Sequence, residues 1–191
     1  MDRRNFFRRA TREVGTRTVA ALDTWARQHA SRWVRPPFAL DELEFLLACT
    51  RCNACIEACP TGVIFPLAPH AGAQVAGTPA LDLLHKACQL CADWPCLQAC
   101  EPGALKYPGT KKKKRRILPR LARLRIDPAI CLPYQGPECG ACRDSCPVRD
   151  ALLWERERPR IDPARCTGCA QCREACVVEP KAITVGSWHT S

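Results

Sequence analysis

Sixteen cysteines, arranged in four groups of four, constrain this chain of 191 residues more than any other feature. Aromatic residues make up only 6% of the chain and prolines number 17, so a large conventional hydrophobic core is not expected. The cysteines must therefore help to organise the fold. The first group is Cys49, Cys52, Cys55 and Cys59, the second is Cys88, Cys91, Cys96 and Cys100, the third is Cys131, Cys139, Cys142 and Cys146, and the fourth is Cys166, Cys169, Cys172 and Cys176.

The first group has the spacing Cys-x2-Cys-x2-Cys-x3-Cys followed by Pro60, which is typical of bacterial proteins that bind pairs of [4Fe–4S] clusters. Three cysteines on a tight turn can reach three corners of one cluster, while the fourth is carried toward a neighbouring cluster. The fourth group repeats this spacing, and the second and third groups each lengthen one gap. We predict four [4Fe–4S] clusters with all sixteen cysteines as ligands.

Disulfide bonds and zinc sites could also account for so many cysteines. Disulfide-rich domains are usually small and secreted, and no uncharged apolar run lies near the N-terminus. Structural zinc sites use separated pairs or mixed Cys/His sets, whereas these cysteines come in fours. The four histidines follow no metal-binding spacing relative to the cysteines.

The exchange of the fourth cysteine permits two ways of wiring the groups. A sequential wiring joins group one to group two and group three to group four, and a nested wiring joins one to four and two to three. A basic run between the second and third groups separates the halves and favours the sequential wiring. The sequential ligand sets are Cys49, Cys52, Cys55 and Cys100; Cys88, Cys91, Cys96 and Cys59; Cys131, Cys139, Cys142 and Cys176; and Cys166, Cys169, Cys172 and Cys146.

The chain divides at charged segments into an arm, two units and a linker. Apolar residues at helical spacing among arginines predict a basic amphipathic helix in an N-terminal arm over 1–40. Lys111–Arg116 carries six adjacent positive charges and marks an exposed linker over 109–120. The fold class is then small α+β, with tandem bacterial 2[4Fe–4S] ferredoxin-like units over 41–108 and 121–191.

The predicted units contain short elements around the cysteine groups. Brief helices are expected after the third cysteine of each group, and small glycines and alanines, including Gly140 and Gly168, leave backbone amides free to approach the clusters. Trp94 either shields a cluster or packs in the core. Short edge strands are expected at Leu105–Tyr107, Leu124–Ile126, Leu152–Trp154 and Ile183–Val185.

Charge and motif content narrow the function. The formal net charge is +10, but four oxidised clusters with their thiolates would contribute about −2 each and leave about +2, so a nucleic-acid partner is not favoured. No apolar stretch is long enough to span a membrane. The sequence has no nucleophile–base pair and no nucleotide-binding glycine loop, which indicates an electron carrier or accessory protein and not an enzyme.

The residues around the cysteines resemble the ferredoxin-type proteins of periplasmic nitrate reductase systems, the NapF group, with relatives in the NapG and MauM group. The similarity lies in residues 35–40, 45–46 and 49–56 at the first group and in residues 129–135, 138–139 and 142–146 around the third. Residues 88–96 are closer to the NapG and MauM form. The resemblance implies electron transfer to, or maturation of, the molybdenum-containing catalytic subunit of that reductase, as its cytoplasmic precursor, or contact with another redox protein. The alternative is an exported NapG/MauM-like electron carrier in a quinol-linked redox chain.

The N-terminus bears on location. Residues 2–8, Asp-Arg-Arg-Asn-Phe-Phe-Arg, are similar to a twin-arginine export motif. A working signal also needs an apolar segment of roughly seven to fifteen residues, and Arg12, Glu13 and Arg17 interrupt the candidates. We predict a cytoplasmic protein whose arm contacts a partner or the inner membrane surface. Periplasmic export through the twin-arginine-like N-terminus is the alternative.

Overall fold

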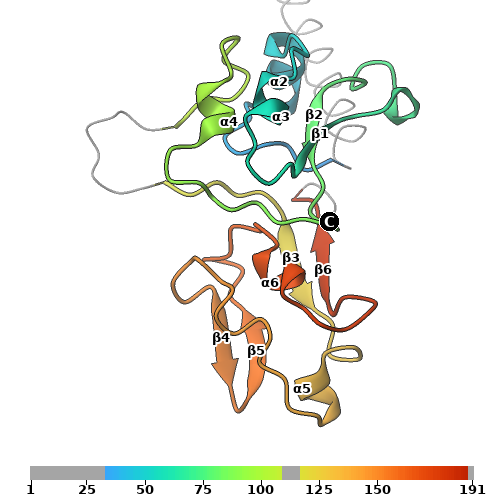
Figure 1. The fold of residues 1–191 in the computed structure, drawn as a ribbon, viewed down its shortest axis with the longest axis vertical. Coiled ribbons are helices and arrows are strands. Elements are labelled where there is room, and N and C mark those ends of the chain that lie inside the picture. Colours follow the sequence, from blue (N-terminus) through green and yellow to red (C-terminus); the bar gives the residue numbers. More distant parts are fainter. Residues whose placement is uncertain (1–32, 109–116, 189–191) are drawn as a thin grey trace, which may run out of the picture.

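The computed structural model describes residues 33–108 and 117–188, here named the first half and the second half. The two halves are stacked along the long axis of the molecule (Figure 1). The amphipathic helix, the twin-arginine-like motif and the run Lys111–Arg116 lie outside the described residues. No helix among the described residues has the length and apolarity needed to cross a membrane.

Short elements connected by long turns build both halves, as expected of a chain with many prolines and closely spaced cysteines. The first half contains α2 (Glu42–Ala48), α3 (Ala54–Glu57), β1 (Ile64–Pro66), η1 (Pro69–Ala71), β2 (Pro79–Leu81) and α4 (Pro95–Gln98). The second half contains β3 (Arg123–Ile126), α5 (Leu132–Gln135), β4 (Leu152–Glu155), β5 (Arg158–Ile161), α6 (Gln171–Glu174) and β6 (Ile183–Gly186). This mixed helix and strand content agrees with the predicted α+β class.

Three two-stranded antiparallel sheets pair β1 with β2, β3 with β6 and β4 with β5. Three of the four predicted strands are confirmed, because β3, β4 and β6 contain them. The strand predicted at Leu105–Tyr107 is wrong: Leu105 forms only an isolated bridge to Ala39. Phe38 has a φ of 61°, which turns its chain away and keeps this pairing from extending.

The predicted brief helices appear in three groups, but they span the third cysteine instead of following it. The residue two positions before that cysteine has a positive φ in each case, at Asn53 (63°), Trp94 (53°) and Ala170 (66°). This shared bend starts the helix even though the second group has a longer gap. The third group differs, since its helix α5 follows Cys131 and none spans Cys142.

The last residues of the predicted arm, 33–40, pack on the rest of the first half. Arg35 lies at their centre: its guanidinium donates to Glu42 Oε2 at 3.0 Å, to Thr78 Oγ1 at 2.9 Å and to the Pro79 carbonyl at 2.9 Å. The same group lies 4.7 Å from the centroid of the Phe45 ring. Residues 33–40, α2 and β2 are therefore joined by one largely buried polar centre.

The largest hydrophobic cluster includes residues of both halves. Phe45 and Trp94 of the first half belong to it together with Leu121, Ala122 and Ala170 of the second. The second half has a small cluster of its own formed by three buried residues, Leu124, Cys172 and Ile183. The two halves thus share a core on either side of the linker.

Candidate iron–sulfur cluster sites

Four thiols line a small cavity of the first half. The wall between them is apolar and includes Val63, Leu81 and Trp94. The cysteines are three members of group two and the last member of group one, namely Cys88, Cys91, Cys96 and Cys59.

A second cavity of this kind lies in the second half. Ile126, Trp154 and Ile183 form part of its apolar wall. Its cysteines are three members of group three and the last member of group four, Cys131, Cys139, Cys142 and Cys176.

The remaining eight thiols form two further sets, which the electrostatics of their most buried members reveal. Burial is the main cause that raises the pKa of Cys55 to about 11, and the nearby thiols of Cys100, Cys49 and Cys52 contribute to the same shift. Burial likewise raises the pKa of Cys172. The thiols that add to this shift are Cys169, Cys166, Cys142 and Cys146, three of which belong to the same sequential set.

The four sets are those of the sequential wiring. The cavity in the first half joins groups one and two, and the cavity in the second half joins groups three and four. A nested wiring would have placed thiols of groups two and three around one cavity. We name each set by the group that supplies three of its thiols. The members are Cys49, Cys52, Cys55 and Cys100 for site one; Cys88, Cys91, Cys96 and Cys59 for site two; Cys131, Cys139, Cys142 and Cys176 for site three; and Cys166, Cys169, Cys172 and Cys146 for site four.

The chemistry of the four sets fits [4Fe–4S] clusters. Each set offers four thiols, which is the donor set that such clusters use, and apolar walls surround the thiols of sites two and three. Among residues 33–108 and 117–188, no three His, Cys, Asp or Glu side chains come close enough to share a single metal ion. Thiolates bound to a cluster stand at separate corners of a cube, so they need not meet at one point.

Burial makes several of these thiols weak acids when no metal is bound. Burial, with a smaller contribution from neighbouring thiols, raises the pKa of Cys88 and of Cys142 to about 11 and that of Cys96 to about 12. At neutral pH these thiols therefore retain their protons in the metal-free chain, and binding iron must displace them. The positive iron ions would offset the charge that burial and repulsion disfavour.

Backbone amides and a hydroxyl group approach several thiols. The amide of Leu105 donates to Cys100 Sγ at 3.4 Å, and the amide of Gly168 donates to Cys166 Sγ at 3.4 Å. Thr61 Oγ1 lies 3.6 Å from Cys59 Sγ. Hydrogen bonds to cluster sulfurs influence the reduction potential, so the predicted role of Gly168 agrees with its geometry.

Gly168 also meets a steric demand that its sequence context does not reveal. Its φ is +75°, and a Cβ there would lie 2.0 Å from the carbonyl oxygen of Ala122. By contrast, nothing lies within 4 Å of a Cβ built at Gly140, the other glycine singled out from the sequence.

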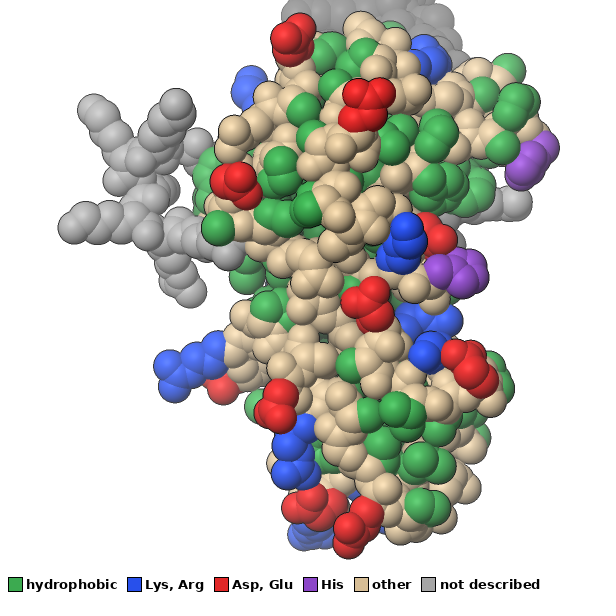
Figure 2. Space-filling model, viewed as in Figure 1, with side chains coloured by type: hydrophobic (Ala, Val, Ile, Leu, Met, Phe, Trp, Pro, Cys, Tyr) green, Lys and Arg blue, Asp and Glu red, His purple; other side chains and the backbone are tan. Residues whose placement is uncertain are grey.

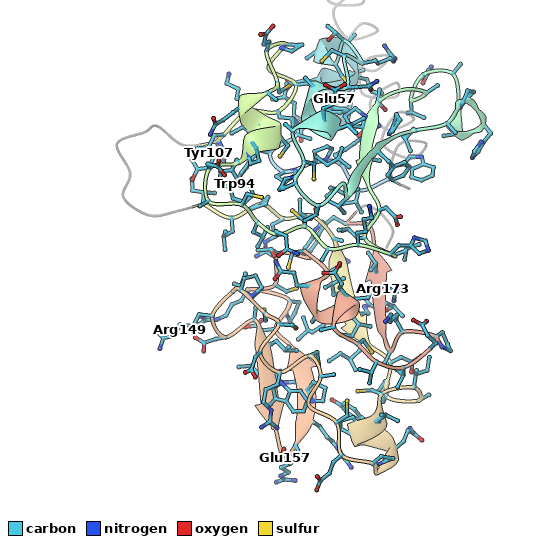
Figure 3. All side chains as sticks on the ribbon, viewed as in Figure 1. Glu57, Trp94, Tyr107, Arg149, Glu157 and Arg173 are labelled. Atoms are coloured by element: carbon cyan, nitrogen blue, oxygen red, sulfur yellow. The ribbon has the colours of Figure 1, made fainter. Side chains whose placement is uncertain are left out.

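Two tryptophans contribute to the cavity walls. Trp94, for which the sequence left cluster shielding and packing open, packs in the core and lines the cavity of site two: it is 6% exposed and lies edge-on to Phe38 at 4.8 Å between ring centroids (Figure 3). Trp154 was missed by sequence reasoning. It lines the cavity of site three, and its position on β4, opposite Pro159 on β5, bears no fixed spacing to any cysteine.

These paired sets of thiols, three of whose four groups carry a short helix that starts at a left-handed residue, define a ferredoxin-type iron–sulfur protein. Comparison with known families agrees. Residues 123–177 match the family described as "4Fe-4S dicluster domain", and residues 47–65 match the one described as "4Fe-4S binding domain". The predicted cofactor content of four [4Fe–4S] clusters is confirmed.

Relatives extend the match over nearly the whole chain. The methylamine utilization ferredoxin-type protein MauM of Methylobacillus flagellatus is 35% identical, with 96% of this chain and 83% of the relative covered. The ferredoxin-type protein NapG of Haemophilus influenzae is 35% identical, with 96% of this chain and 71% of the relative covered. The chain belongs to the ferredoxin-type 4Fe–4S proteins of the NapG/MauM type.

The predicted NapF subgroup is confirmed only at the level of this wider group. The ferredoxin-type protein NapF of Escherichia coli is 34% identical, but the match covers 84% of this chain, less than the NapG and MauM matches do. The NapG/MauM-like spacing of residues 88–96 agrees with this order. No solved structure gives a significant match.

Proposed function

We propose that this chain relays single electrons through four [4Fe–4S] clusters held by the sixteen cysteines in the sequential arrangement. When bound, such clusters accept and donate one electron each without making or breaking bonds in a substrate. The observation that carries the proposal is the enclosure of two cavities by four thiols each. The chain itself supplies the thiols, the apolar walls that exclude water and the amides that approach the sulfurs.

The proposed partners are a quinol-linked donor and a redox enzyme as acceptor, as in a carrier of the NapG/MauM type. The molybdenum-containing catalytic subunit of periplasmic nitrate reductase is the acceptor that the Nap relatives suggest. A relay of this kind would work in the periplasm, the location that the twin-arginine-like N-terminus offers as the alternative.

A second candidate function is maturation of the catalytic subunit in the cytoplasm, and the similarity to NapF supports it. The cytoplasmic location predicted from residues 1–40 would accompany this role, with the arm contacting the precursor or the inner membrane. Fractionation of cells, with the protein detected by antibody, separates the two candidates. Recovery in the periplasm supports the relay, and recovery with the cytoplasmic precursor supports maturation.

Anaerobic purification tests the shared part of both candidates. The protein should contain iron and sulfide in equal amounts and should show the broad visible absorbance of [4Fe–4S] clusters, which dithionite bleaches. Replacing Cys139 by alanine should lower the iron content, whereas replacing Ser145, whose hydroxyl donates to the Cys142 carbonyl at 2.8 Å, should not. Colourless protein that contains zinc in place of iron would overturn the proposal.

A further inference from the structure

Four hydrogen bonds join the two halves at one place, which we name the junction (residues 84–88 and 169–174). The amide of Cys88 donates to the carbonyl of Cys169 at 2.9 Å, and Gln171 Nε2 donates to the carbonyl of Cys88 at 3.0 Å. The amide of Ala87 donates to Glu174 Oε1 at 3.3 Å. The fourth bond runs from Arg173 Nε to the carbonyl of Leu84 at 3.1 Å, and Figure 3 shows Arg173 where the halves meet.

The junction is closed to solvent at its centre. Ala87 and Cys88 are 0% and 7% exposed, and Cys169 and Ala170 across from them are 6% and 1% exposed. Backbone groups buried in this way must be paired within the protein. The contact is therefore a fixed part of the fold.

Two cysteines of different sites thus face each other across the junction. Cys88 belongs to site two and Cys169 to site four, and a single hydrogen bond connects their backbones. This bond completes a short path from one thiol to the other through two cysteine residues. Because electronic coupling falls steeply with distance, a short bonded path favours electron transfer between these two sites.

Proximity within each half continues the series. Cys59 lines the cavity of site two and lies four residues after Cys55 of site one. Cys176 lines the cavity of site three and lies four residues after Cys172 of site four. Sites one and three therefore lie beside sites two and four.

The thiols of sites two and four are more buried than those of sites one and three. Sites two and four each have two buried cysteines, Cys88 and Cys96 in the one and Cys169 and Cys172 in the other. Sites one and three each have one, and Cys52 of site one is exposed. Partners outside the molecule thus have better access to sites one and three.

We propose that electrons cross between the halves at the Cys88–Cys169 contact, so that the sites work in the order one, two, four, three and not in chain order. This inference rests on the proposed function. Each transfer oxidises one site by one electron and reduces the next by one electron, with no bond broken and no proton moved. A one-electron donor at one end of the series and a one-electron acceptor at the other complete the balance.

Paired removal of sites tests this order by electron paramagnetic resonance, because reduced clusters are paramagnetic and broaden each other's signals when close. The chain with Cys49→Ala and Cys131→Ala retains sites two and four, and the chain with Cys49→Ala and Cys166→Ala retains sites two and three. Both should hold half of the iron of the parent. After reduction with dithionite, the first should show a broadened spectrum and the second a narrow one. Broadening in the second chain alone, or equally in both, would overturn the order.

Side-chain variants test the junction with all sixteen cysteines present. Gln171 and Glu174 are positioning residues at the junction. Gln171→Ala combined with Glu174→Ala should therefore weaken the magnetic interaction between sites two and four while the iron content stays unchanged. The matched control combines Gln98→Ala with Glu155→Ala, because Gln98 donates to the Asp93 carbonyl and Glu155 pairs with Arg160 within single halves. An unchanged interaction in the junction variant, or an equal loss in the control, would contradict the proposal.

The outcomes also separate the two levels of the proposal. A parent protein without any dithionite-reducible cluster signal would refute the proposed function itself. A parent with full cluster signals, but with interactions that follow another order, would refute only the inference about the junction.

Discussion

The two halves present the same number of thiol sets but stabilise them by different means. The first half contributes large buried side chains, including Phe45, Leu83 and Trp94, to the main hydrophobic cluster. The separate cluster of the second half has three buried members, and one of them is Cys172 itself. A similar cysteine pattern can thus be built into a half with a substantial core and into one that depends on its thiol sites.

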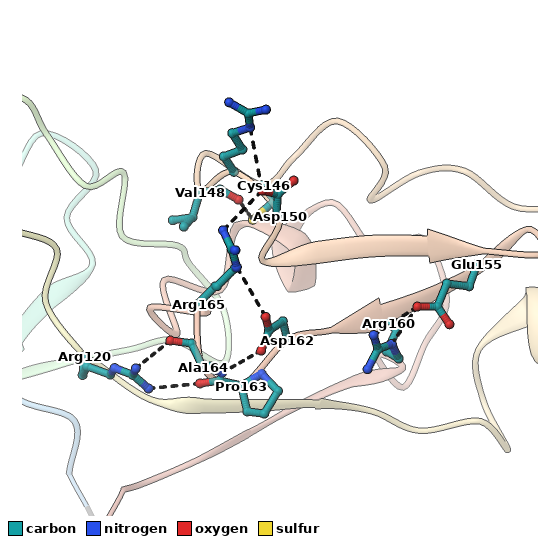
Figure 4. A network of polar contacts seen from close by, with 11 residues as sticks. Arg120, Cys146, Val148, Asp150, Glu155, Arg160, Asp162, Pro163, Ala164 and Arg165 are labelled. Carbon is teal, nitrogen blue, oxygen red and sulfur yellow. Dashed lines mark hydrogen bonds and ion pairs between the residues drawn. The ribbon is translucent and has the colours of Figure 1, made fainter.

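The two halves also differ in how deeply their ion pairs are buried. The ion pair between Arg35 and Glu42 in the first half is largely buried, with side chains 9% and 12% exposed. The ion pairs of the second half are more exposed, for example where Arg165 contacts both Asp150 and Asp162 (Figure 4). Figure 2 accordingly shows side chains of opposite charge next to one another over the lower part of the molecule. Surface pairs of this kind add little stability, so cluster binding must contribute more to the second half.

Removal of iron should have the largest effect and should separate the halves most clearly. Without metal the buried thiols hold protons, and the second half loses the interactions that its small core cannot replace. We expect amide hydrogen exchange to become fast throughout 117–188 while parts of the core around Phe45 remain protected. Mass spectrometry of peptides from loaded and chelated protein measures this, and equal loss of protection in both halves would contradict the comparison.

Replacing Arg35 by alanine should have the next largest effect. The change leaves the largely buried Glu42 without its partner and removes the donors to Thr78 and Pro79, which should lower the free energy of unfolding by about 3 kcal/mol. Denaturant titration of the loaded protein measures the loss. The control is Arg165→Ala in the second half, where an exposed pair should cost less than about 1 kcal/mol. Similar losses for the two variants would remove the distinction between buried and surface pairs.

Gly168→Ala compares a crowded left-handed turn with an open one. A left-handed alanine costs about 1–2 kcal/mol, and the clash with Ala122 should add about 1–3 kcal/mol. Gly103 in the first half is the matched control, because its φ is +73° and nothing lies within 4 Å of its added Cβ. Unfolding of the two variants, followed by circular dichroism, should differ by the clash alone. Equal destabilisation would show that the approach of residues 117–122 to Gly168 is not a constraint.

The smallest expected effect concerns the surface of the second half. Arg143 pairs with Glu157 at 2.7 Å and also lies 4.5 Å from the centroid of the Trp154 ring. Glu157→Ala removes only the exposed ion pair and should cost no more than about 0.5 kcal/mol, whereas Arg143→Ala also loses the ring contact and should cost about 1 kcal/mol. Thermal unfolding of the two variants checks the order, and a greater loss for Glu157→Ala would reverse it.

The cofactor content and most of the strands could be predicted from the sequence because they follow from local patterns. Cysteine spacing specifies which thiols can share a turn, and short β-branched or apolar runs predicted three strands correctly. The wiring required the fold. The spacing around Cys59 and Cys146 allowed either partner group, and only the packing of distant segments brings Cys59 to Cys88.

Other features depend on backbone geometry that residue types do not reveal. The left-handed conformation shared by Asn53, Trp94 and Ala170 occurs at an amide, an aromatic and a small side chain, so no single residue preference signals it. The junction could not be predicted from the sequence, because its two segments, residues 84–88 and 169–174, lie far apart along the chain. The basic linker pointed to separated halves, whereas the described residues on either side of it meet in one core.

The burial of Leu121 and Ala122 among side chains of the first half has a consequence for proteolysis. Ile117 is also anchored there, since its amide donates to the Tyr107 hydroxyl at 2.9 Å. A protease that cleaves between Pro108 and Ile117 would therefore cut the polypeptide without releasing either fragment. The nicked protein would elute from a sizing column as a single particle and would dissociate only in denaturant.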